Sequence, residues 1–112
     1  KINWKTDVNI MQEKMAEFAL GAIQNKKNKT YYINFLYDIS PNCDCYGFND
    51  TPIAQNIGIM ASKDPVALDK ACYDAVGEKV FQSIYPEIDS LVQLRYAEEL
   101  GIGKQKYNLV EI

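Results

Sequence analysis

Apolar side chains recur every three or four positions between residues 7 and 27. This spacing predicts an amphipathic helix with one apolar stripe, which we expect to pack in the core. The stripe consists of Val8, Met11, Met15, Phe18, Ala19, Ala22 and Ile23. Two short runs of aromatic and apolar residues, at 31–37 and 57–61, predict buried strands. The first run lacks clean alternation, so we expect it to be covered on both faces.

After the second predicted strand, the pattern changes to a helical period. Asp64 followed by Pro65 is typical of a helix start, with the aspartate as N-cap and the proline at the first helical position. Cys72 lies on the apolar face of this helix, so we expect its thiol to be structural. Gly77 either ends the helix or weakens it.

The remaining sequence predicts a further helix after Pro86, stopped at Gly101, and a closing strand at 107–112. Strands and helices are mixed along the chain. This order predicts one α/β domain over residues 1–112, with a small, mainly three-stranded sheet packed by about three helices. An exposed sheet edge would then pair with further chain or with a partner.

The composition narrows the classes of function. The 112 residues include 12 basic and 15 acidic ones, and the resulting net charge of −3 argues against a nucleic-acid-binding surface. The chain contains no histidine, which excludes Ser–His–Asp and Cys–His catalysis as well as histidine-ligated zinc. We see neither a membrane-spanning run nor a signal peptide, and we expect a cytoplasmic protein without a membrane partner.

The segment 38–50 is rich in turn-forming residues and carries two thiols, Cys43 and Cys45, separated by one residue. Such a pair can bind a soft metal or an iron–sulfur cluster, can act as a redox dithiol, or can be structural. The residues alone leave these three alternatives open. A closed metal site usually needs four ligands, of which this loop supplies two thiolates.

A second candidate site lies at Ser62, Lys63 and Asp64, where the second predicted strand meets the following helix. The simple interpretation is a capped strand-to-helix junction. The functional interpretation is a binding site for an anionic cofactor or ligand, because helix N-termini favour anions and strand ends are common ligand sites. The lysine cluster at Lys26, Lys27 and Lys29 is expected to be a solvated helix end.

Four segments occur together in a specific order, at 32–36, 38–45, 50–53 and 57–69. This combination resembles a family of iron–sulfur centre proteins built on domain of unknown function 362. In this comparison Cys43 and Cys45 match a Cys-Asp-Cys motif of the family. Asp64, Pro65 and Asp69 match its helix start.

The resemblance implies a bacterial or archaeal cytoplasmic protein. It also implies a ferredoxin-like segment with four-cysteine cluster motifs ahead of this region. No such four-cysteine run is present here, so the resemblance identifies the chain as the C-terminal part of a longer protein. The implied cofactor is an iron–sulfur cluster that this fragment cannot complete by itself.

We therefore expect a redox or electron-transfer domain whose Cys43–Cys45 loop lies near a metal or cluster. Its expected partners are the ferredoxin-like segment and a second copy of the chain. One alternative is a domain that binds an anionic small molecule at Ser62–Asp64, with structural cysteines. Another is a scaffold that docks against a further domain through its sheet edge.

Overall fold

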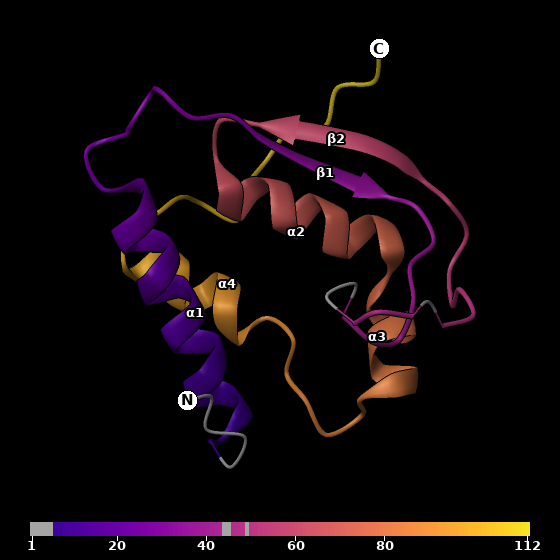
Figure 1. Ribbon diagram of the computed structural model, residues 1–112. Helices are drawn as coiled ribbons and strands as arrows, with labels where there is room; N and C mark the ends of the chain where they lie inside the picture. The colour runs from indigo at the N-terminus through magenta and orange to yellow at the C-terminus, as the bar shows by residue number, and fades with distance from the viewer. Residues whose placement is uncertain (1–5, 44–45, 49) are drawn as a thin grey trace.

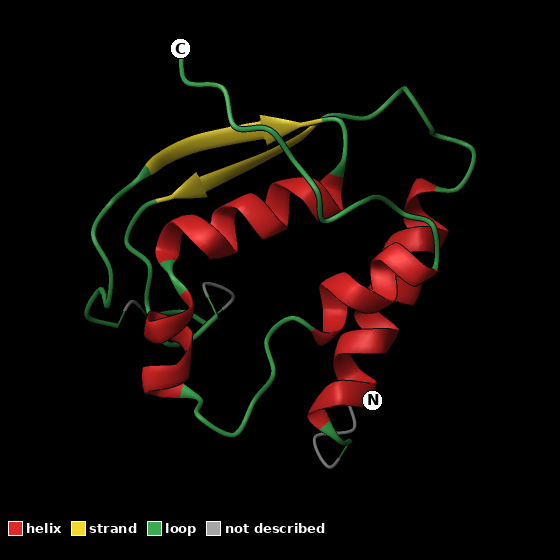
Figure 2. Ribbon diagram, turned by 180° about the vertical axis from the view of Figure 1, so that it is seen from behind, coloured by secondary structure: helices red, strands yellow, loops and turns green. Residues whose placement is uncertain are grey.

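The computed structural model describes residues 6–43, 46–48 and 50–112. Within them the chain forms four helices and two strands (Figures 1 and 2). Their order along the chain is α1 (Val8–Ile23), β1 (Tyr32–Leu36), β2 (Gly58–Ser62), α2 (Pro65–Val76), α3 (Glu78–Ile84) and α4 (Val92–Glu99). The mixed α/β class is confirmed. No helix in this described part is long and apolar enough to cross a membrane.

The sheet is smaller than the sequence predicts, because it has two strands where three were expected. β1 and β2 pair antiparallel, with Tyr32 opposite Ser62 and Leu36 opposite Gly58. The predicted closing strand at 107–112 is wrong, since these residues join no ladder. The Tyr107 hydroxyl instead donates to the Asp74 carboxylate on α2, at 2.9 Å, and draws the tail to that helix.

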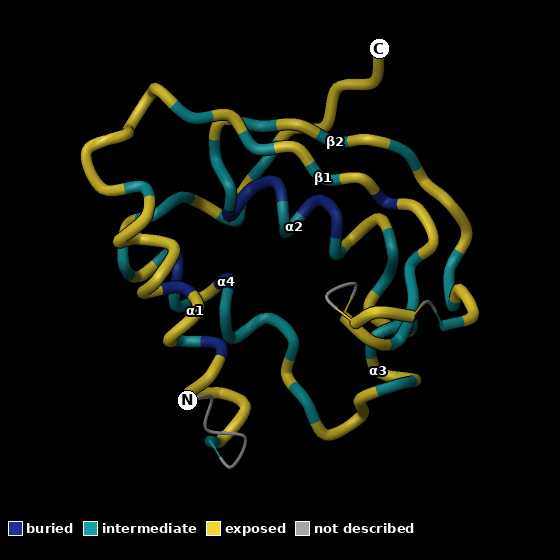
Figure 3. Tube along the Cα trace, viewed as in Figure 1, coloured by how far each residue is buried: buried dark blue, intermediate teal, exposed yellow. Residues whose placement is uncertain are grey.

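The prediction that the first strand is covered on both faces is also wrong. α2 packs against one face of the sheet, and no other described helix contacts either strand (Figures 1 and 2). On the opposite face Ile33, Phe35 and Ile59 are 57%, 68% and 58% exposed. Exposed residues therefore alternate with half-buried or buried ones along both strands (Figure 3).

Helix α1 buries a different face from the one predicted. Met11, Met15 and Phe18 of the apolar stripe are exposed, whereas Gln12 and Ala16 are buried against α4. The Gln12 side chain donates to the Asp89 carbonyl at 3.0 Å and accepts from the Gln93 N–H at 3.2 Å, at the start of α4. These bonds and the small Ala16 allow close approach on this face, so the bulky stripe faces outward.

Helix α2 is the centre of the structure and the most buried helix (Figure 3). Gly77 ends it with a φ of 95°, in the left-handed region that favours glycine, and α3 follows at once. The break explains why four helices form where three were expected. Two small groups of buried residues form the core, the first being Leu36, Leu68 and Cys72 and the second Ala16, Val66, Leu94 and Ala97.

Candidate functional site

The junction between β2 and α2 is organised by the Asp64 carboxylate. Its Oδ1 accepts hydrogen bonds from the backbone N–H groups of Val66 and Ala67, at 2.9 and 3.0 Å. Asp64 is therefore the N-cap of α2, and this prediction is confirmed. Ser62 supports the same turn, because its hydroxyl accepts from the Asp64 N–H at 3.0 Å.

Asp64 also ties the C-terminal tail to this junction. Its Oδ2 accepts from the Lys104 backbone N–H at 2.8 Å, so three backbone donors bind one carboxylate. Gly103 lies directly against this group, and a Cβ at that position would fall 2.6 Å from the Asp64 Cγ. The close approach explains why a residue without a side chain stands there.

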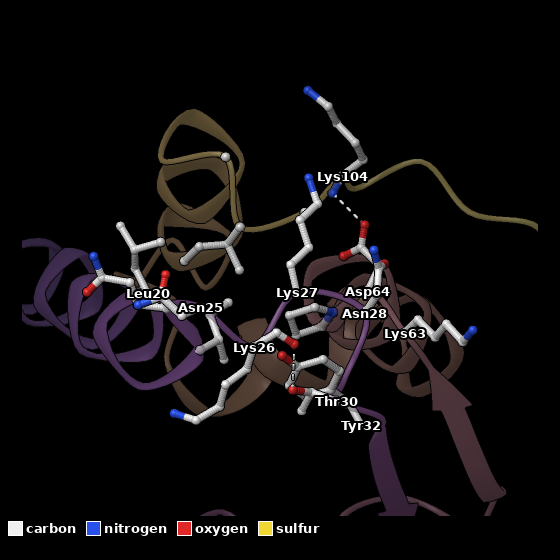
Figure 4. Close-up of a pocket in the computed structure, with 16 residues that line it drawn as sticks. Leu20, Asn25, Lys26, Lys27, Asn28, Thr30, Tyr32, Lys63, Asp64 and Lys104 are labelled. Carbon is white, nitrogen blue, oxygen red and sulfur yellow. Dashed lines mark hydrogen bonds between the residues drawn. The ribbon is translucent and has the colours of Figure 1, made fainter.

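A cavity of about 470 Å³ opens beside this junction (Figure 4). Its wall comes from the end of α1 and the segment after it, from the start of α2, and from the tail after α4. Four lysines line it, and Asp64 is the one acidic residue among the described residues of its wall. The four are Lys26, Lys27, Lys63 and Lys104.

The four ammonium groups differ in their present contacts. Lys26 donates to the Ala22 carbonyl at the end of α1, and Lys63 lies 5.1 Å from the centre of the Tyr31 ring. Lys104 is 3.8 Å from Glu98, and its side chain is 73% exposed. For the Lys27 ammonium the described residues show no ion pair or hydrogen bond. In Figure 4 Lys27 and Lys104 extend to the same side of the view.

The structure places the three residues of the predicted anion site in different roles. Lys63 and Asp64 line the cavity, whereas Ser62 does not and instead supports the turn. The N–H groups of Val66 and Ala67, which an anion would use at a helix N-terminus, are taken by Asp64. An anion in this cavity would therefore be bound by lysine side chains.

The cysteine loop lies at the opposite end of the sheet. It follows the last residue of β1, Leu36, whereas Ser62 ends β2, and the two strands run antiparallel. A five-residue strand spans roughly 14 Å, so the two candidate sites are separate. Hydrogen bonds to backbone groups hold the loop, and two of them come from Ile53 and Tyr85. The Ile53 N–H donates to the Ile39 carbonyl at 2.8 Å, and the Tyr85 hydroxyl donates to the Pro41 carbonyl at 3.0 Å.

Cys43 is exposed in this loop, as predicted for an accessible thiol. Cys45, the other predicted metal ligand, lies outside the described residues. No group of three or more cysteine and carboxylate side chains that could hold a metal occurs in the part of the chain that the structure describes. A complete four-ligand cluster site therefore does not fit these residues alone.

The third thiol, Cys72, is confirmed as a core residue. It is 8% exposed and packs with Leu36 and Leu68. Burial raises the pKa of the Cys72 thiol, as does the nearby Asp69 carboxylate, while the hydrogen bond from the Asn34 amide at 3.4 Å works in the other direction. A buried thiol with a raised pKa is mostly protonated near neutral pH, which makes it a poor nucleophile and metal ligand.

Sequence reasoning missed three of the four cavity lysines as site residues. Lys26 and Lys27 are predicted as a solvated helix end, and nothing in the sequence singles out Lys104. The clustering of Lys26 and Lys27 was the available signal for those two. The position of Lys104 depends on the bond between its backbone and Asp64, 40 residues away, which no local pattern reports.

Fold and site define a small mixed α/β protein with a lysine-lined cavity at the start of its central helix. The chain belongs to the family called domain of unknown function 362, whose family model matches residues 1–74. This match contains the cysteine loop and the β2–α2 junction. No curated protein and no solved structure matches the sequence.

Proposed function

We propose that this protein binds a small anionic molecule, carrying phosphate or carboxylate groups, in the lysine-lined cavity beside α2. The observation that supports this function is the charge of the wall. Four lysines line it, and the one carboxylate among its described residues, that of Asp64, already accepts hydrogen bonds from three backbone N–H groups. The chain as a whole carries a net charge of −3, so this basic wall contrasts with its average.

The present lysine contacts do not prevent such binding. Exposed ion pairs contribute about 0–1 kcal/mol, and the Lys104–Glu98 pair is long, at 3.8 Å. A ligand with two negative charges can therefore recruit these flexible side chains at small cost. The cavity volume of about 470 Å³ lies within the usual range for small-molecule sites.

A thermal-unfolding titration with inorganic phosphate, against chloride at matched ionic strength, tests the proposal. A ligand that binds the folded state raises the midpoint with increasing concentration. The rise should disappear in Lys27→Ala and shrink in Lys63→Ala, but persist in Lys79→Ala, which removes an exposed lysine on α3, outside the cavity. A phosphate response that is the same in all three variants would contradict the proposal.

The cysteine loop favours a second function. Cys43 is exposed on a loop held by Tyr85, so the loop can present thiolates to a metal or iron–sulfur cluster at the end of the sheet. The other ligands would come from outside this loop, since two thiolates do not complete a site. In this role the protein would belong to a redox or electron-transfer system.

Anaerobic titration with cobalt(II) tests this second function, because cobalt–thiolate bonds absorb strongly in the near ultraviolet. The absorption should appear with the native sequence and be lost in Cys43→Ser and Cys45→Ser. Cys72→Ser is the matched control, because the Cys72 side chain is buried in the core and should not contribute. Absorption that survives in Cys43→Ser, or that never appears, would exclude the thiolate role.

A further inference from the structure

A second cavity, of about 300 Å³, has the opposite charge from the lysine-lined one. It lies among residues of β1, α2, α3 and α4, next to Ile39 at the start of the cysteine loop and away from the β2–α2 junction. Its wall is mostly apolar and includes the aromatic residues Tyr73 and Phe81. Asp69 is the one charged residue of this wall among the described residues.

Asp69 stands on α2 and is held in a fixed position from β1. Its Oδ1 accepts a hydrogen bond from the Asn34 amide at 2.8 Å. No lysine or arginine forms an ion pair with Asp69 in the described part of the chain. Lys70, the adjacent residue on α2, pairs instead with Asp74 at 2.5 Å. A half-buried carboxylate without a cationic partner carries a desolvation cost that a bound cation would offset.

The rings beside Asp69 are suited to the same kind of ligand. Tyr73 and Phe81 stack face to face, with their centres 4.6 Å apart and their planes at 15°, and the Lys70 ammonium lies 6.0 Å from the centre of the Tyr73 ring. These two rings and the aliphatic side chains of the wall can cover the apolar part of a ligand. We propose that this cavity binds a small organic amine, with its ammonium group on Asp69 and its apolar part against the rings.

Benzylamine is a suitable probe, and benzyl alcohol is its neutral counterpart of similar shape. Binding is followed by heteronuclear NMR of the native chain, through the amide signals of residues that line the cavity. Benzylamine should saturate these shifts about tenfold more tightly than benzyl alcohol, as expected for a hydrogen bond to a charged group. Equal affinities, or no saturable binding of benzylamine at millimolar concentrations, would overturn the proposal.

Variants locate the charge that is responsible. Asp69→Asn keeps the size of the side chain and should reduce benzylamine affinity about tenfold while leaving benzyl alcohol unchanged. Asp74→Asn is the matched control, since it removes an equal charge from the same helix outside the cavity. An equal loss in both variants would overturn the assignment to Asp69. Should Asp69→Asn fail to fold, the comparison of the two probes on the native chain still decides the outcome.

Discussion

Replacing Gly103 with alanine should destabilise the protein, and removing Asp64 should reverse the effect. The alanine Cβ would overlap the Asp64 carboxylate, at 2.6 Å from its Cγ. This carboxylate cannot turn away cheaply, because three backbone N–H groups bind it. Gly103 itself does not have the positive φ that disfavours other residues, so its backbone accepts alanine.

The expected magnitudes follow from the bonds at risk. Losing the cap of α2 costs about 1 kcal/mol, and losing the bond to the tail adds about 1 kcal/mol or more. Asp64→Ala should therefore lower the free energy of unfolding by about 2 kcal/mol. Gly103→Ala should cost about 2 kcal/mol, in the usual range for overpacking. In the Asp64→Ala background, Gly103→Ala should instead stabilise by about 0.5 kcal/mol, because alanine restricts the unfolded chain.

Urea unfolding of the two single variants and the double variant measures this coupling, which should be about 2.5 kcal/mol. Gly21→Ala is the control, since that glycine lies in the exposed part of α1 with nothing within 4 Å of an added Cβ. It should not destabilise. Additive effects of Asp64→Ala and Gly103→Ala would refute the contact between the α2 cap and the tail.

Three further predictions concern the packing around α2 and α4. Cys72→Ala should lower the free energy of unfolding by about 1 kcal/mol, and native Cys72 should react with a thiol reagent only as fast as the protein opens; rapid native labelling would contradict its burial. Gln12→Ala should cost about 2 kcal/mol in urea unfolding, because it leaves the Gln93 N–H without its acceptor; an unchanged midpoint would show that this bond contributes nothing. The Arg95 guanidinium holds the pKa of Asp89 below its ordinary value of 3.8. The stability that this pair contributes is therefore complete above pH 3.8 and is lost as the pH falls through the lowered pKa. In Asp89→Asn the urea midpoint should fall less steeply with decreasing pH in this acid range. An unchanged pH dependence of the midpoint in this variant would argue against the pair.

The sequence predicted the elements whose signals are local. The start of α2 is set by Asp64 and Pro65, which act within one turn, and both its position and its cap are confirmed. The two strands were also found, because short aromatic and apolar runs favour them. The sequence did not predict which face of a helix or strand is buried. Helix α1 buries the side that carries Gln12 because the partner groups lie on and before α4, 77 and 81 residues further on.

In the candidate sites, too, residues with a local sequence signal were predicted and residues positioned by distant parts of the chain were not. Lys63 and Asp64 were predicted from their place beside a helix start, and both line the cavity. Lys104 reaches it only because the tail returns to bond with Asp64, whereas Lys26 and Lys27 come from the segment after α1. Asp69 came from the family motif, but its cavity depends on residues of β1, α3 and α4, which periodicity along α2 does not report.

The most direct test of anion binding at the lysine-lined cavity is a heteronuclear NMR titration of the native chain with inorganic phosphate at constant ionic strength. We predict saturable shifts of the amide signals of Lys27, Lys63 and Lys104, which line the cavity. The signal of Lys79, on α3, should stay in place. Shifts that rise without saturation at all four lysines, or no shifts at the cavity, would contradict the proposed function.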